Sequence, residues 1–108
     1  MDLFIELEQK RQMLDKSIKE LRKSGTNLAQ SEKEYKILLR TECLKLRSEG
    51  MPIGMIDKTC YGIPSVAEAR FKRDVADTIY KANLEAINSI KLEIRIIQNQ
   101  IDKEYGHE

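Results

Sequence analysis

The chain has 108 residues, 34% of them charged and 41% hydrophobic, with two Phe, four Tyr and no Trp. This composition is typical of long paired helices and leaves little aromatic bulk for a compact globular core. Its 19 basic and 18 acidic residues give a net charge of +1, which provides no general reason to expect binding to nucleic acid or to an anionic membrane. No apolar run approaches the roughly 18 residues needed to cross a bilayer, and the N-terminus lacks the pattern of a signal peptide, so we expect a cytoplasmic protein.

The first long helix is predicted over residues 2–49. Its apolar side chains fall on two interleaved seven-residue series, the spacing that lines up side chains on one helix face: Phe4, Leu7, Leu14, Ile18, Leu21, Leu28, Tyr35, Leu39 and Leu46. Gly25, with Ser, Thr and Asn beside it, weakens the helix locally. Because Leu21 and Leu28 are one heptad apart, the phase survives this stretch. We therefore favour a continuous helix with a local kink over a break at Gly25.

A connector is predicted over residues 50–64. Gly50 is placed to end the first helix in a left-handed conformation, and Pro52 suits a first helical position. A short helix over about 52–61 is expected to pack against the long helices through a shared face of Ile53, Ile56 and Cys60.

The second long helix is predicted over residues 65–105. Ser65 and Glu68 have the spacing of an N-terminal capping box, directly after Pro64. Apolar residues then recur at steps of three and four, with Asn83 as the one polar member: Ala76, Tyr80, Ile87, Ile90, Ile94, Ile97 and Ile101. Leu92 and Ile96 lie roughly on the opposite side, and a helix that is apolar on two sides is expected to contact two partners.

These elements predict an all-α fold in a single domain, 1–108: a long antiparallel, coiled-coil-like helical hairpin with a short connector helix. A single hairpin of this size buries little apolar area. We therefore expect a homodimer that forms a four-helix bundle, with Leu92 and Ile96 as candidate self-association residues.

The sequence indicates neither catalysis nor a cofactor. No phosphate-binding loop or metalloprotease motif is present, and no histidine lies near the scattered carboxylates to act as a base. Two cysteines, Cys43 and Cys60, and the lone histidine, His107, fall short of the roughly four ligands that a structural zinc site needs. We expect a reduced cysteine pair, with a disulfide as the alternative. The protein is predicted not to be an enzyme.

Nucleic-acid binding is weakly indicated. The connector and its flanks have the outline of a helix-turn-helix, but Lys58 and Glu68 occupy the positions around Gly62 where that motif needs buried residues. The cluster of Arg70, Lys72 and Arg73 is flanked by acidic residues, and it fits a solvated helix face better than a phosphate site.

The connector is more apolar than a turn requires. Its Met, Ile and Tyr side chains either form a lid over the open end of the hairpin or present a surface to a partner protein, because flexible Met side chains adapt to irregular surfaces. For the second alternative, the candidate partner-binding residues are Met55, Tyr61, Arg70 and Arg73, which would give an apolar centre with a polar rim.

Two stretches, LRSEGMPIGMIDKTCYGIP and ARFKRDVADTIYKANLEAINSIKLEIRIIQNQIDKEYG, resemble a family of small helical proteins encoded by phages and prophages of Firmicutes-type bacteria. The resemblance extends over most of the chain and implies a phage origin and a location in the host cytoplasm. The family carries no assigned activity, so no functional residue is transferred from it.

The resulting functional expectation is a non-enzymatic interaction protein, a helical adaptor or inhibitor of a phage or host protein. Its expected partners are a second copy of itself and one such protein, with no membrane. The alternative is an accessory nucleic-acid-binding protein in phage recombination or replication.

Overall fold

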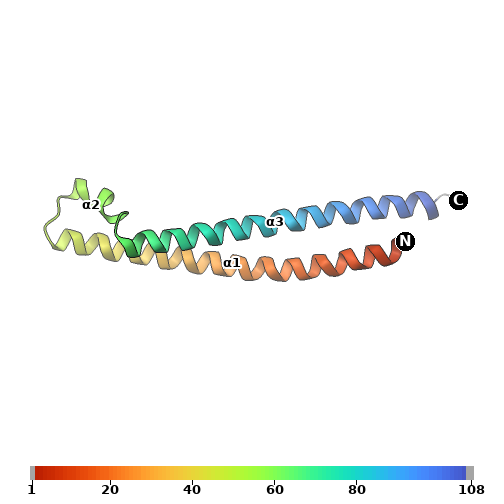
Figure 1. The fold of residues 1–108 in the computed structure, drawn as a ribbon, viewed down its shortest axis with the longest axis horizontal. Helices are drawn as coiled ribbons and strands as arrows, with labels where there is room; N and C mark the ends of the chain where they lie inside the picture. Colours follow the sequence, from red (N-terminus) through yellow and green to blue (C-terminus); the bar gives the residue numbers. More distant parts are fainter. Residues whose placement is uncertain (1, 107–108) are drawn as a thin grey trace. The chain divides into compact units, whose positions relative to one another are not determined.

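The computed structural model describes residues 2–106, and every regular element in that range is a helix. The elements are α1 (Leu3–Ser48), α2 (Ile53–Cys60) and α3 (Pro64–Tyr105) (Figure 1). The predicted all-α class is confirmed, as is the pair of long helices with a short helix between them. Each boundary lies within one residue of its predicted position.

The chain divides into two units, and both long helices contribute to each of them. The first unit combines Met1–Ser24 with Tyr80–Glu108, and the second is Gly25–Ile79, which includes α2. Within the first unit α1 and α3 are antiparallel, because Lys10 forms an ion pair with Glu93 while Ser24, further along α1, contacts Asn83, which comes earlier in α3. The single-domain organisation expected from the sequence stays a prediction.

Both ends of α1 are capped by local interactions. At the start, the Asp2 carboxylate accepts a hydrogen bond from the Phe4 N–H at 2.8 Å, which satisfies a backbone donor that has no partner within the helix. At the end, Gly50 has a φ of +93°. Its N–H donates to the Arg47 carbonyl, and the Met51 N–H donates to the Leu46 carbonyl, each at 3.1 Å. This is a Schellman motif, and it confirms Gly50 as the left-handed residue after the helix.

The α1 helix is continuous through Gly25, as predicted. The neighbouring Ser24 is buried, and its hydroxyl donates to the Leu21 carbonyl at 3.0 Å. The Asn83 side-chain amide of α3 in turn donates to the Ser24 hydroxyl oxygen at 2.9 Å. The polar residue that interrupts the apolar stripe of α3 is therefore satisfied by a polar residue of α1 in the same unit.

Three details of the connector differ from the expectation. Pro52 precedes α2 as its N-cap residue and is not its first helical residue. Ile53 is 69% exposed, so only Ile56 and Cys60 of the expected face are buried. The predicted capping box is wrong because α3 begins one residue earlier, at Pro64, which leaves Ser65 inside the first turn. Proline is favoured at a first helical position because the N–H it lacks would have no partner there.

Buried residues follow the predicted stripe in both units. In the first unit Ile87, Ile90 and Ile97 of α3 are buried, together with Leu7 of α1. In the second unit the core consists of Tyr35, Cys60 and Val66, and it is extended by partly buried neighbours: Leu38, Leu39, Cys43, Leu46, Ile63 and Ala69. The core residues of the second unit thus come from all three helices, and α2 is held by Cys60 at their centre.

Truncating the buried stripe should reduce stability far more than truncating an exposed apolar residue. Ile90 is 7% exposed and Ile5, in the same unit, is 56% exposed. We expect Ile90→Ala to lower the free energy of unfolding by about 2–4 kcal/mol, because it removes buried methyl groups and leaves a cavity. Ile5→Ala should change it by less than about 0.5 kcal/mol. Urea denaturation followed by circular dichroism measures both variants, and equal losses would contradict this arrangement of the stripe.

Candidate functional site

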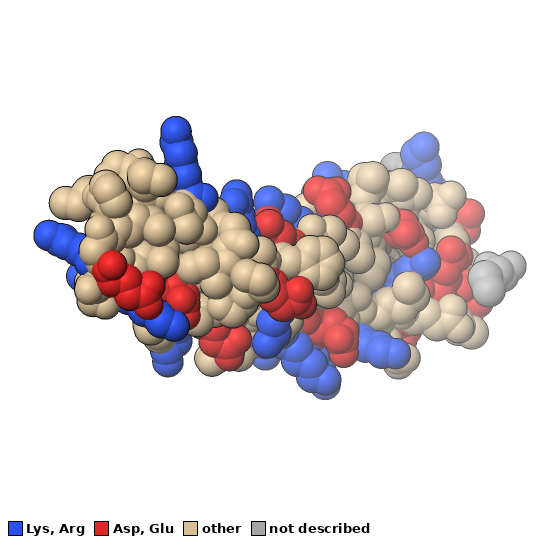
Figure 2. All heavy atoms as spheres, turned by 60° about the vertical axis from the view of Figure 1, so that its left-hand side comes forward, with Lys and Arg blue, Asp and Glu red and all other residues tan. Residues whose placement is uncertain are grey.

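The strongest candidate for a binding surface lies on α2 and the turn that follows it. Ile53, Met55 and Tyr61 are 69%, 56% and 45% exposed, and these three residues are called the α2 surface below. Figure 2 brings this end of the second unit forward and shows uncharged side chains gathered there, with charged side chains at the edges. An exposed apolar area with a polar rim is the composition of a protein-interaction site.

The α2 surface is anchored by two buried residues of the same short helix. Ile56 is 7% exposed and Cys60 is fully buried. Since these residues are one helical turn apart, they fix one face of α2 onto the second unit. Ile53, which is on the same face but at the start of the helix, and Met55 are exposed. A helix that served only as a lid would not need apolar side chains in water, whereas Ile53 and Met55 are both exposed.

Arg70 lies at the edge of this surface. Its guanidinium carbon is 5.7 Å from the centroid of the Tyr61 ring, within the range of a cation–π interaction. Met55, Tyr61 and Arg70, three of the four residues predicted to bind a partner, are exposed, and the contact brings two of them, Tyr61 and Arg70, together.

Arg73, the fourth candidate, has partners within its own unit. Its guanidinium lies 4.6 Å from the centroid of the Tyr35 ring, 2.8 Å from an Asp74 carboxylate oxygen and 3.5 Å from a Glu32 carboxylate oxygen. The side chain is 23% exposed, and the hydrogen bond to Asp74 is the main cause that raises the pKa of Arg73. A partner protein would have to compete with these contacts to bind Arg73.

The rest of the basic cluster is also matched by acidic residues. Lys72 contacts the Glu34 carboxylate at 3.4 Å. A hydrogen bond from Gln30 and the charge of Lys72 lower the pKa of Glu34. Lys72 and Arg73 therefore have carboxylates of the second unit beside them, which reduces the positive charge that they could offer to a phosphate backbone.

The outward side of α3 carries a second set of apolar residues. In the first unit Leu92 and Ile96 are 54% and 50% exposed, which confirms that they lie away from the buried stripe. In the second unit Phe71 and Val75 of α3 are 63% and 41% exposed. By heptad spacing, Phe71 occupies the same register position as Leu92, and Val75 the same position as Ile96.

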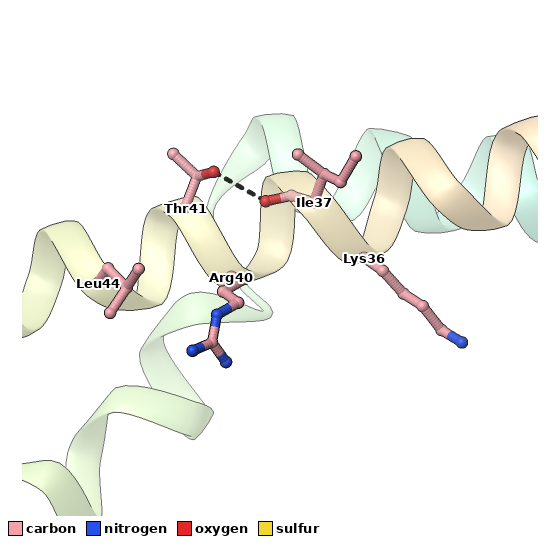
Figure 3. Close-up of a pocket in the computed structure, with 5 residues that line it drawn as sticks. All are labelled: Lys36, Ile37, Arg40, Thr41 and Leu44. Atoms are coloured by element: carbon pink, nitrogen blue, oxygen red, sulfur yellow. Dashed lines mark hydrogen bonds between the residues drawn. The ribbon is translucent and has the colours of Figure 1, made fainter.

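The surface of the described residues includes two shallow hollows that each lie within one unit. One, of about 440 Å³, lies along α1 and is lined by Lys36, Ile37, Arg40, Thr41 and Leu44. Figure 3 shows Ile37 and Thr41 on one side of the helix and Lys36 and Arg40 on the other, with the Thr41 hydroxyl donating to the Ile37 carbonyl at 2.8 Å. The other, of about 310 Å³, lies in the first unit beside Ile96, Lys10 and Glu93. Neither brings together a nucleophile and a base.

Cys43 of α1 and Cys60 of α2 form a close thiol pair. Their sulfur atoms are 3.1 Å apart, and both cysteines are free. Burial is the largest cause that raises the pKa of the Cys60 thiol to about 11. Sequence spacing gave no sign of this proximity, because it depends on how α2 folds back onto α1.

No group of three or more His, Cys, Asp or Glu side chains within residues 2–106 is placed to hold a metal ion, and His107 lies outside that range. In the same part of the chain, no helix combines the length and the apolar character needed to cross a membrane.

The chain was compared with known protein families, curated proteins and solved structures. A scan against protein-family models and searches of curated proteins and of solved structures found no match to this chain. The resemblance to phage-encoded proteins therefore stays a prediction.

The contacts of Arg73 predict a structural role that Arg70 does not share. Arg73→Ala should lower the free energy of unfolding by about 1–2 kcal/mol, because it removes a partly buried cation–π contact and two ion pairs. Arg70→Ala, at an exposed position, should change it by less than about 0.5 kcal/mol. Thermal and urea denaturation compare the two variants. Unchanged stability for Arg73→Ala would show that these contacts contribute nothing in solution.

Proposed function

We propose that this protein is a non-enzymatic interaction protein that associates with a second copy of itself and binds a partner protein through the α2 surface. The observation that carries the proposal is that α2 has more apolar side chains than its own unit buries. Ile56 and Cys60 are buried in the second unit, while Ile53, at the start of the helix, and Met55 are exposed. An exposed apolar surface on a firmly anchored helix favours binding, because little ordering is required when a partner docks.

The partner is proposed to be a phage or host protein on which this chain acts as a helical adaptor or inhibitor in the host cytoplasm. Support for the phage context comes from the sequence resemblance alone. Support for a protein partner comes from the chemistry of the α2 surface, where Met, Ile and Tyr side chains and the nearby Arg70 are residue types suited to interface centres.

Nucleic-acid binding, the alternative expected from the sequence, has no specific observation in its favour. Two of the three cations in the basic cluster contact carboxylates of their own unit, Lys72 with Glu34 and Arg73 with Glu32 and Asp74. A phosphate-binding surface would need cations that are available to release counterions on binding.

Self-association is proposed to use the outward side of α3. Leu92 and Ile96 together would leave two large apolar side chains in water in a monomer, and burying them against another copy would be favourable. An antiparallel or parallel pairing of two such helices would give the four-helix arrangement expected from the sequence.

The combined substitution Leu92→Glu with Ile96→Glu should weaken self-association, because it places two charges in the proposed interface. Sedimentation velocity at tens of micromolar should show the wild type as a dimer and the variant as a monomer with unchanged helix content. Lys91→Gln with Gln98→Glu changes the net charge by the same amount at exposed positions of α3 away from Leu92 and Ile96, and should leave the dimer intact. A monomeric wild type would refute this part of the proposal.

Partner binding is tested by placing a photoreactive phenylalanine analogue at Met55. In an extract of phage-infected host cells, we expect a crosslink to one discrete protein that survives nuclease treatment. The same analogue at exposed Lys16 in the first unit is the control and should give no such product. Tyr61→Ala should reduce the yield about tenfold if Tyr61 is central to the interface. Equal crosslinking from both positions would contradict the proposed site, and a product lost with nuclease would favour the nucleic-acid alternative.

A further inference from the structure

The thiol pair formed by Cys43 and Cys60 is held in place by the core of the second unit. Cys60 is fully buried beside Tyr35 and Val66, and Cys43 is partly buried at the edge of the same core. The Cys43 thiol donates to the Cys60 sulfur at 3.1 Å, and the Cys60 thiol donates to the Leu39 carbonyl at 3.5 Å. The two sulfur atoms therefore face each other as a consequence of packing.

We propose that Cys43 and Cys60 are a site of reversible disulfide formation that locks α2 onto α1. A disulfide bond is about 2.05 Å long, so the sulfur atoms need to approach by only about 1 Å. Shifts of that size lie within the reach of side-chain rotation at the end of a short helix such as α2. The bond would cross-link two helices that otherwise meet through side-chain packing.

Access determines the order of the chemical steps. Cys60 has no exposed surface, whereas Cys43 is partly exposed. The Cys43 thiolate, after losing its proton to water, attacks a small disulfide such as oxidised glutathione. This forms a mixed disulfide on Cys43 and releases one glutathione thiolate. The Cys60 thiolate then attacks the Cys43 sulfur, closing the intramolecular bond and releasing the second glutathione. The two protein thiols are oxidised, and one glutathione disulfide is reduced to two thiols.

The second step should be slow near neutral pH. Burial, the hydrogen bond with Cys43 and the nearby charges of Glu42 on α1 and Asp57 on α2 raise the pKa of Cys60 to about 11. The residue that α3 packs against Cys60 is Val66, which carries no charge. The thiolate fraction of Cys60, and with it the closure rate, should rise about tenfold for each pH unit below this pKa. Near neutral pH the disulfide therefore closes slowly, and it accumulates only when the oxidant is present for a long time.

The consequence of closure is a more rigid α2. The bond would close the loop from Cys43 to Cys60, which contains the α2 residues Ile53 and Met55, and would restrict the unfolded chain. The modification site itself does not depend on the proposed function. If the α2 surface binds a partner, however, oxidation would fix its position.

Intact mass spectrometry tests the proposal on the full chain. The folded protein is incubated with oxidised glutathione at several pH values, quenched with acid, and treated with N-ethylmaleimide under denaturing conditions. We expect a wild-type product that is two hydrogen atoms lighter, carries no maleimide, and forms faster as pH rises. Cys60→Ala should stop at a single glutathione adduct on Cys43, and Cys43→Ser should stay unmodified while folded. Wild-type protein that accumulates two glutathione adducts, or only intermolecular dimers, would overturn the proposal.

Thermal unfolding gives a second readout that does not depend on the variants folding well. Oxidation of the wild type should raise Tm by about 10 °C, and a dithiol reductant should reverse the change. An oxidised wild type with lower or unchanged Tm would show that the bond distorts or does not constrain the second unit.

Discussion

The structure depends on the need to cover the apolar stripe of α3. Residues of this stripe that recur at steps of three and four are buried in both units: Ala76 in the second unit, and Ile87, Ile90 and Ile97 in the first. Burial of each such isoleucine side chain is worth about 1.5–3 kcal/mol. The one polar member, Asn83, is compatible with the stripe because it donates to the hydroxyl oxygen of buried Ser24. A shift of the helices by one turn would separate this pair and leave the buried Ser24 hydroxyl and the partly buried Asn83 amide without each other, so the hydrogen bond favours a single register.

The second unit differs from the first because its long helices also pack against α2. The core formed by Tyr35, Cys60 and Val66 draws one residue from each helix. Cys60 occupies the centre of this core, so α2 is fixed through one face only. The exposed residues of α2 are then a consequence of its composition, because a short helix held through Ile56 and Cys60 leaves its other large apolar side chains, Ile53 and Met55, exposed. These unburied apolar side chains make the α2 surface a candidate for binding.

The ion pairs described above each join two residues of the same unit. Arg73 stacks over Tyr35 between Asp74 and Glu32, Lys72 lies beside Glu34, and Lys10 pairs with Glu93. At least one partner in each ion pair is substantially exposed to solvent, so these pairs contribute little to stability. Their larger effect is on the charge that is free to bind a ligand. Lys72 and Arg73 of the basic cluster have carboxylates beside them, whereas the α2 surface is apolar.

The amino-acid sequence by itself determined the helices, their boundaries to within one residue, and the buried face of α3, because heptad spacing, Gly50 and Pro64 act locally. It also placed Leu92 and Ile96 on the side of α3 opposite the stripe, since their position follows from helical periodicity alone. The register positions of Phe71 and Val75 could have been found by the same means. Only the tertiary structure decided that Arg73 is engaged by Tyr35, that Ile53 is exposed while Cys60 is buried, and that Cys43 and Cys60 face each other. Each of these depends on how α2 folds back and which α1 residues lie opposite α3, and such contacts between distant segments leave no periodic signal in the chain.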